Sequence, residues 1–192
     1  MKKRVLAVLL TSVMLLGIAA CGKKEPGTTA TIGISASDNV SGESLSVGAE
    51  VEQFVNVDVP SISSGREKAV GLYNKYFEGG IMDSEEWLRS LEYEALPLYD
   101  TYLTKLAEFE YTTPEVQNLK NTFLQSSQLQ RDAIQDVVNG IKNNDSELLT
   151  SAEDKINQSE ELYKSYEESL QSICSSNNIK INGTIGTATD AE

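Results

Sequence analysis

Few side chains in this 192-residue sequence have the chemistry for catalysis or tight metal binding. There is no histidine, which excludes Ser-His-Asp and Cys-His nucleophilic systems, imidazole zinc sites and the Glu-x-x-His di-metal sites of helical bundles. Adjacent glutamates could act as a general acid and base, but neighbours in sequence diverge on a helix, so we interpret them as solvated surface. These pairs are Glu85-Glu86, Glu160-Glu161 and Glu167-Glu168. The sequence therefore predicts a protein that is not an enzyme and has no catalytic residue, cofactor or metal.

Residues 1–20 have the layout of a secretory signal peptide. A basic tip, residues 2–4, is followed by residues 5–20, which carry no charge. As a helix this run of about 16 residues would span only about 24 Å, short of the ~30 Å hydrocarbon core of a bilayer. A cleaved export signal is therefore favoured over a permanent transmembrane helix.

The uncharged run ends in Ile18-Ala19-Ala20-Cys21, which resembles the lipobox of bacterial lipoproteins. This resemblance covers residues 1–21 only, and the helical domain that follows resembles no named family. It implies cleavage before Cys21, attachment of diacylglyceryl lipid and palmitate to that residue, and a location on the extracytoplasmic face of the cell membrane. The alternative is a plain signal peptide that is cleaved after Ala20.

Cys174 is then the only thiol that is not committed to lipid, which excludes an internal disulfide. It falls on an apolar helix stripe, so we interpret it as a buried small hydrophobic residue rather than a redox or dimerising thiol.

The composition is strongly acidic. The chain has 16 Lys and Arg against 29 Asp and Glu, and removing residues 1–20 takes away three cations, which leaves 13 against 29 and a net charge of −16. Nucleic acid would be repelled by such a chain, so it is excluded as a partner. Lys23 and Lys24 either favour anionic headgroups beside the lipid or are solvated flanking charges.

Beyond the signal peptide the chain divides into four parts. Residues 21–50 are rich in Gly, Ser, Thr and Ala, which predicts a lipid-anchored flexible linker. Residues 51–63 are rich in valine and contain Pro60, which predicts an extended segment packing on a helical bundle. That bundle should span residues 64–178, and residues 179–192 are predicted to be a disordered tail.

Four helices are predicted within residues 64–178. Ser64-Gly65-Arg66-Glu67 reads as a capping box that opens a short helix, which ends at Gly79-Gly80. Three long helices should follow, from about residue 84 to 109, 114 to 142 and 146 to 177, separated by Pro114 and by a turn at residues 143–145. The expected fold is all-α: an antiparallel bundle of three long helices plus one half-length N-terminal helix.

In each of the three predicted long helices the apolar pattern is interrupted, and the three interruptions are predicted to lie at the same level along the bundle axis. Folding the pattern at the turns places Pro97 level with Ser126 and Ser127, and these serines level with Ser159. In one account the small serines only let helices approach where the bundle passes from four helices to three, and the layer has no function. In the other, these four residues and the positive end of the half-length helix line a cavity for a polar or anionic ligand.

We therefore expect a lipid-anchored extracytoplasmic helical bundle that acts as a non-enzymatic binding or interaction module of the cell envelope. Its expected partners are the membrane, through lipid on Cys21, and an envelope protein. Tyr93 and Tyr99 lie off the core stripes and could mark the partner surface. The alternatives are a small-ligand sensor or solute-binding bundle, a carboxylate-dependent wall-acting hydrolase, and a structural spacer or an inhibitor that acts by occupying a partner.

Overall fold

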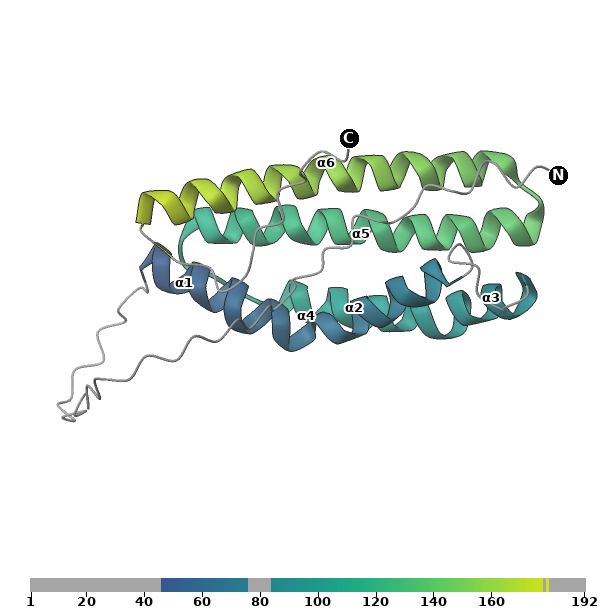
Figure 1. Ribbon diagram of the computed structural model, residues 1–192, viewed down its shortest axis with the longest axis horizontal. Helices are drawn as coiled ribbons and strands as arrows, with labels where there is room; N and C mark the ends of the chain where they lie inside the picture. Colours follow the sequence, from purple (N-terminus) through teal and green to yellow (C-terminus); the bar gives the residue numbers. More distant parts are fainter. Residues whose placement is uncertain (1–45, 76–83, 178, 180–192) are drawn as a thin grey trace, which may run out of the picture.

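The protein is all-α over the residues that the computed structural model describes, which are 46–75, 84–177 and 179. Two of the four helices in these residues contain a π-helical segment. The first consists of α1 (Val47–Gln53), η1 (Phe54–Asp58) and α2 (Val59–Asn74), and the second of α3 (Ser84–Ser90), η2 (Leu91–Ala95) and α4 (Leu96–Glu108). The remaining two are α5 (Pro114–Asn143) and α6 (Ser146–Asn177) (Figure 1).

Each π-helical segment precedes a proline. In an α-helix the proline ring collides with the carbonyl four residues earlier, and proline has no N–H to donate. Here the amide of Val59 bonds to the Phe54 carbonyl and the amide of Leu96 to the Leu91 carbonyl, five residues back, which widens the turn. Pro60 and Pro97 each follow as the second residue of the next α-helical segment, so both helices continue past a residue that usually ends one.

The predictions of an extended segment at residues 51–63 and of a half-length N-terminal helix are wrong. The first helix runs from Val47 to Asn74, so Ser64 lies inside it and caps nothing, and the last residues of the predicted linker 21–50 are helical. Buried apolar residues of this segment fall on one face of the helix, at i, i+3, i+4, i+8 and i+11: Val51, Phe54, Val55, Val59 and Ile62. Pro60 and the valines had suggested an extended segment. Residues 1–45, the predicted stop at Gly79-Gly80, and the predicted tail apart from Ile179 lie outside the described residues.

The four helices pack antiparallel in two layers (Figure 1). The α5–α6 hairpin forms one layer, and the helices that contain α2 and α4 form the other. Between α2 and α3, the indole N–H of Trp87 donates to the carbonyl oxygens of Leu72 and Tyr73 at 3.2 Å. No helix among the described residues is long and apolar enough to cross a membrane.

The turn between α5 and α6 lies where the sequence predicted it. Asn144 adopts the left-handed conformation (φ 53°), which Asn tolerates better than most residues. The Asp145 carboxylate then accepts hydrogen bonds from the amides of Glu147 and Leu148, which caps α6. The prediction that α5 opens at Pro114 is confirmed as well.

Two carboxylates tie the first helix to the loop before α5. Glu50, only 3 % exposed, accepts hydrogen bonds from the backbone amide and the hydroxyl of both Thr112 and Thr113. The Tyr111 hydroxyl donates to Asp58 at 2.6 Å. These bonds satisfy amide groups at the start of α5 that have no partner within the helix, so a side chain 63 residues away performs the capping.

Candidate functional site

Two of the serines predicted to share a layer meet at the α5–α6 interface. The Ser126 hydroxyl donates to the Ser159 carbonyl at 2.9 Å, and the Ser159 hydroxyl donates to the Ser126 carbonyl at the same distance. The two hydroxyl oxygens are 3.0 Å apart, and both residues are almost fully buried. The pair therefore joins the two helices through small side chains, which allows close approach of the backbones.

Ser127 faces α4 instead. Its hydroxyl lies 3.5 Å from the hydroxyl of Tyr102, and both side chains are buried. Ser127 is thus in the same part of the core as the Ser126–Ser159 pair, on the adjoining face of α5.

Pro97 does not join the serines. It is exposed on α4, and Tyr102 occupies the position opposite Ser127 that the sequence had suggested for Pro97. The predicted register assumed a sharp turn near residue 112, whereas α4 ends at Glu108 and the loop to Pro114 is not helical. The positive helix end predicted beside this layer is absent too, because the first helix continues through Ser64.

A buried arginine completes the polar layer. The Arg66 Nε donates to the Tyr99 hydroxyl at 3.1 Å and its Nη2 to Gln130 Oε1 at 2.7 Å. Tyr99 also donates to Gln130 Oε1 at 2.7 Å, so the three residues form a closed triangle that links α2, α4 and α5. Sequence reasoning had placed Arg66 in a capping box. The available signal was its spacing, four residues after Ile62 and three before Ala69 on the same buried stripe.

The electrostatics of this layer suit structure better than catalysis. Burial alone would lower the pKa of Arg66, but the oxygens of Tyr99 and Tyr102 hold it above its ordinary value, so the guanidinium stays charged. Burial raises the pKa of Tyr99, and raises that of Tyr102 to about 12, against the opposing effect of Arg66. The tyrosines are therefore neutral donors at physiological pH and supply no general base.

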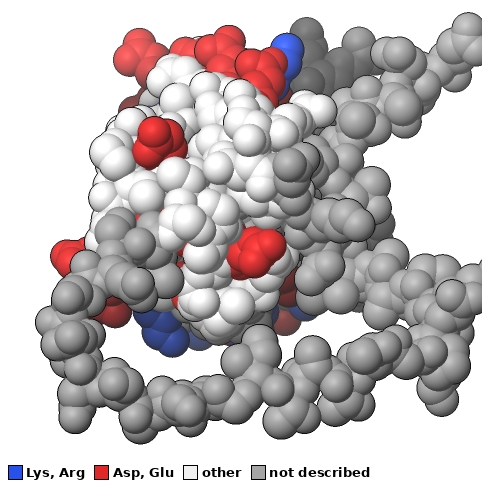
Figure 2. Space-filling view, turned by 90° about the vertical axis from the view of Figure 1, so that its left-hand side faces the viewer, with Lys and Arg blue, Asp and Glu red and all other residues white. Residues whose placement is uncertain are grey.

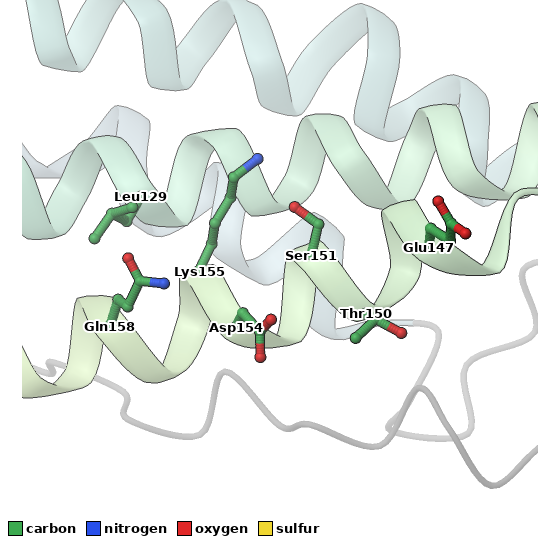
Figure 3. A pocket seen from close by; sticks show the side chains of 7 residues that line it. All are labelled: Leu129, Glu147, Thr150, Ser151, Asp154, Lys155 and Gln158. Carbon is green, nitrogen blue, oxygen red and sulfur yellow. The ribbon is translucent and has the colours of Figure 1, made fainter.

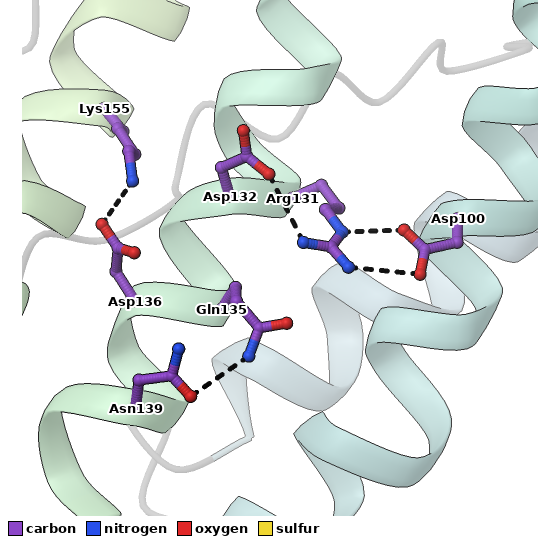
Figure 4. A network of polar contacts seen from close by, with 7 residues as sticks. All are labelled: Asp100, Arg131, Asp132, Gln135, Asp136, Asn139 and Lys155. Carbon is purple, nitrogen blue, oxygen red and sulfur yellow. Dashed lines mark hydrogen bonds and ion pairs between the residues drawn. The ribbon is translucent and has the colours of Figure 1, made fainter. Parts of the chain in front are cut away.

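A second polar network lies on the α4–α5–α6 surface (Figure 4). The Arg131 guanidinium binds both carboxylate oxygens of Asp100, at 2.7 and 3.2 Å, and also contacts Asp132. On the other side of α5, the Asp136 carboxylate accepts hydrogen bonds from the Lys155 ammonium and the Ser151 hydroxyl. These ion pairs connect neighbouring helices at the surface.

An open groove of about 460 Å³ runs beside Lys155 on the α5–α6 surface (Figure 3). The Lys155 ammonium beside the groove is bonded to Asp136, whose carboxylate offsets its positive charge. The groove is lined by Leu129, Glu147, Thr150, Ser151, Asp154, Lys155 and Gln158.

Acidic residues do not assemble into a reactive cluster in the described part of the chain. Glu85, Glu86, Glu160 and Glu161 are exposed, and no three His, Cys, Asp or Glu side chains are placed to hold a metal ion among the residues described.

Comparison with protein-family models, curated proteins and solved structures finds no match.

Proposed function

We propose that this chain is a lipid-anchored, extracytoplasmic helical bundle that acts by binding an envelope partner rather than by catalysis. The observation that carries the proposal is Ile18-Ala19-Ala20-Cys21 at the end of an uncharged run behind a basic tip. Cys21 would carry the lipid. Two or more acyl chains are needed to anchor a protein durably.

The interior of the bundle supports a structural role for the polar layer. Ser126 and Ser159 bond to each other, and Gln130 accepts from both Arg66 and Tyr99. The polar groups that could bind a ligand are thus already hydrogen-bonded to one another within the bundle. This favours packing over a ligand cavity at these serines.

The surface supports a binding role. Of the two tyrosines predicted to lie off the core stripes, Tyr93 is 68 % exposed, whereas Tyr99 is fully buried and the prediction for it was wrong. The acids on either side of Tyr93 are paired with lysines, Glu92 with Lys142 at 2.7 Å and Glu94 with Lys68 at 3.9 Å. An exposed aromatic ring beside neutralised charges suits a protein interface, where tyrosine is enriched and acids are depleted.

The anchor is tested by growing cells that express the full chain with a fatty-acid probe. We expect the probe on the wild-type protein and its loss in Cys21→Ala, with Cys174→Ala as the matched control that keeps the label. Labelling that survives in Cys21→Ala would refute the lipid anchor.

The ligand alternative is tested by thermal unfolding of the exported domain with envelope metabolites. We compare the wild type with the double variant Ser126→Leu and Ser159→Leu. A metabolite that raises the melting temperature of the wild type alone would contradict a purely structural layer.

A further inference from the structure

One end of the bundle is formed by three segments that contain no charged residue. This end, called here the α1–α6 end, consists of residues 46–49 where α1 begins, 111–114 before α5, and 169–177 where α6 stops. Figure 2 looks directly at it and shows a largely uncharged face, with acidic side chains along its edge and others within it. Glu110, in the loop before α5, and Glu115, in the first turn of α5, are exposed acids at this end.

The charge along α6 stops abruptly before this end. Seven Asp and Glu residues lie between Glu147 and Glu168, and none lies in the last nine residues of the helix, 169–177. Nine residues of α-helix rise about 13.5 Å. The Debye length at physiological ionic strength is about 8 Å, so the acids of α6 lie more than one Debye length from the tip of the helix.

The chain that carries Cys21 also enters the bundle at this end. The first described residue is Ser46, which caps α1 through a hydrogen bond from the Ala49 amide to its hydroxyl. The uncharged face and the point of attachment of the anchor-bearing segment therefore coincide.

We propose that the α1–α6 end is the surface that faces an anionic lipid bilayer, so that the bundle stands on the membrane end-on. This inference rests on the proposed lipid anchor at Cys21. A bundle lying on its side would bring the acids of α6 against anionic headgroups. The end-on orientation keeps those acids more than one Debye length away and leaves Glu110 and Glu115, rather than the acids of α6, near the headgroups. This face would contact the layer of lipid headgroups.

The orientation also determines which surface is presented outward. The α5–α6 turn lies at the opposite end, and Lys142, near that turn, is bonded to Glu92 beside Tyr93. The exposed Tyr93 ring is therefore carried in the half of the bundle away from the bilayer, where an envelope protein can reach it.

The test measures the distance of three sites on α6 from the bilayer. Purified, lipidated full-length protein with Cys174→Ala receives a single fluorescent label at Ser176→Cys, Asn157→Cys or Thr150→Cys, all exposed positions. The protein is placed in vesicles of phosphatidylglycerol and phosphatidylethanolamine that contain a headgroup-labelled acceptor lipid. Because positions 150 and 176 are about 39 Å apart along the helix, we expect energy transfer several-fold greater from position 176 than from position 150, with position 157 between them.

Charge variants test the cause. The quantity compared is the difference in energy transfer between labels at positions 176 and 150, called here the gradient. Adding acids at the α1–α6 end with Gln171→Glu and Ser175→Glu should reduce the gradient. The same charge added farther along the helix by Asn157→Glu and Ser165→Glu should preserve it. Uncharged phosphatidylcholine vesicles should also reduce it.

The outcomes separate the two proposals. Protein that washes off the vesicles and lacks lipid by mass spectrometry contradicts the anchor. Lipidated, retained protein with equal transfer from all three sites, or with the greatest transfer from position 150, overturns the end-on orientation alone. A gradient unchanged by acids at the α1–α6 end overturns its electrostatic cause.

Discussion

Thr113 donates two hydrogen bonds to Glu50, from its amide at 2.9 Å and from its hydroxyl at 2.6 Å, across 63 positions of sequence. Thr112 donates the same two kinds of bond to the other carboxylate oxygen. One buried carboxylate thus caps α5 and fastens the first helix to the rest of the bundle.

This contact should make stability depend on acid pH. Burial alone would raise the pKa of Glu50, but the hydrogen bonds from Thr112 and Thr113 outweigh it and lower the pKa from 4.5 to about 2. Because the pKa is lower in the folded state, the stabilisation is complete above the unfolded-state pKa and is lost as the pH falls from about 5 to about 2. We expect Glu50→Gln to lower the free energy of unfolding by about 2 kcal/mol at pH 7, and by progressively less toward pH 2.

Urea unfolding followed by circular dichroism at pH 7, 5 and 3 measures this difference. The control is Glu52→Gln, an exposed neighbour on the same helix, which should change stability little at any of these values. If Glu50→Gln lowers the free energy of unfolding by the same amount at pH 7, 5 and 3, the result would be inconsistent with the depressed pKa of Glu50.

The Arg66 triangle should behave as a single unit. Arg66→Met removes donors to Tyr99 and Gln130 inside the core, and we expect it to lower the free energy of unfolding by about 2 kcal/mol. The double variant Arg66→Met with Gln130→Met should lose less free energy of unfolding than the two single variants lose together. Apolar replacement of both partners leaves fewer buried polar groups unpaired. Denaturant unfolding of the four proteins measures the coupling.

Arg131→Met is the matched control for Arg66→Met, because its ion pair with Asp100 lies at the surface. Surface pairs contribute at most about 1 kcal/mol, and adding Asp100→Asn should bring little further loss. Equal costs for the two arginine changes would argue against a structural role of the buried triangle.

The Ser126–Ser159 pair should show the same coupling on a smaller scale. Each change to alanine removes two contacts of the reciprocal set and should lower the free energy of unfolding by about 1 kcal/mol. The double variant should lose less than the sum, because the contact between the two hydroxyls is counted in both single changes. Additive costs in a double-mutant cycle would mean that the two hydroxyls act independently.

Glycine replacements should separate crowding from helix propensity. At Gly140 a Cβ would lie 2.8 Å from Leu149 Cδ2 and 3.0 Å from the Asp145 carbonyl oxygen, whereas at Gly71 it would meet nothing within 4 Å. Alanine in a helix is favoured over glycine by roughly 0.5–1 kcal/mol. We therefore expect Gly71→Ala to raise the melting temperature and Gly140→Ala to lower it. A rise for both variants in thermal unfolding would show that the α5–α6 turn can relax.

Tyr93 should matter for partner binding and not for stability. With 68 % of its surface exposed, Tyr93→Ser should leave the melting temperature within about 1 °C, because exposed positions away from caps and networks contribute little. A photo-crosslinking residue at position 93 should give a discrete adduct in intact cells, while one at Thr104, exposed on the same helix, should not. Identical adducts from both positions would remove Tyr93 from the proposed interface.

Helix type and several helix ends followed from local chemistry. The start of α5 at Pro114 and the turn at residues 143–145 depend on residues adjacent in sequence, so the pattern predicted them. The burial of Ser126 and Ser159 also followed, because their spacing keeps them on the apolar stripe of α5 and α6. The local signals failed at Pro60, where one widened turn absorbs the proline and lets the helix continue.

What the sequence by itself determined is an acidic, helix-forming chain whose apolar stripes recur every three or four residues, because that periodicity arises within each helix. Only the tertiary structure decided that Pro97 lies on the surface, that Arg66 bonds to Gln130 and that Glu50 caps α5. These relationships depend on the axial register between packed helices that are far apart in the chain. A shift of a few residues in a loop leaves every stripe intact and changes which polar side chains meet, so packing had to select the partners.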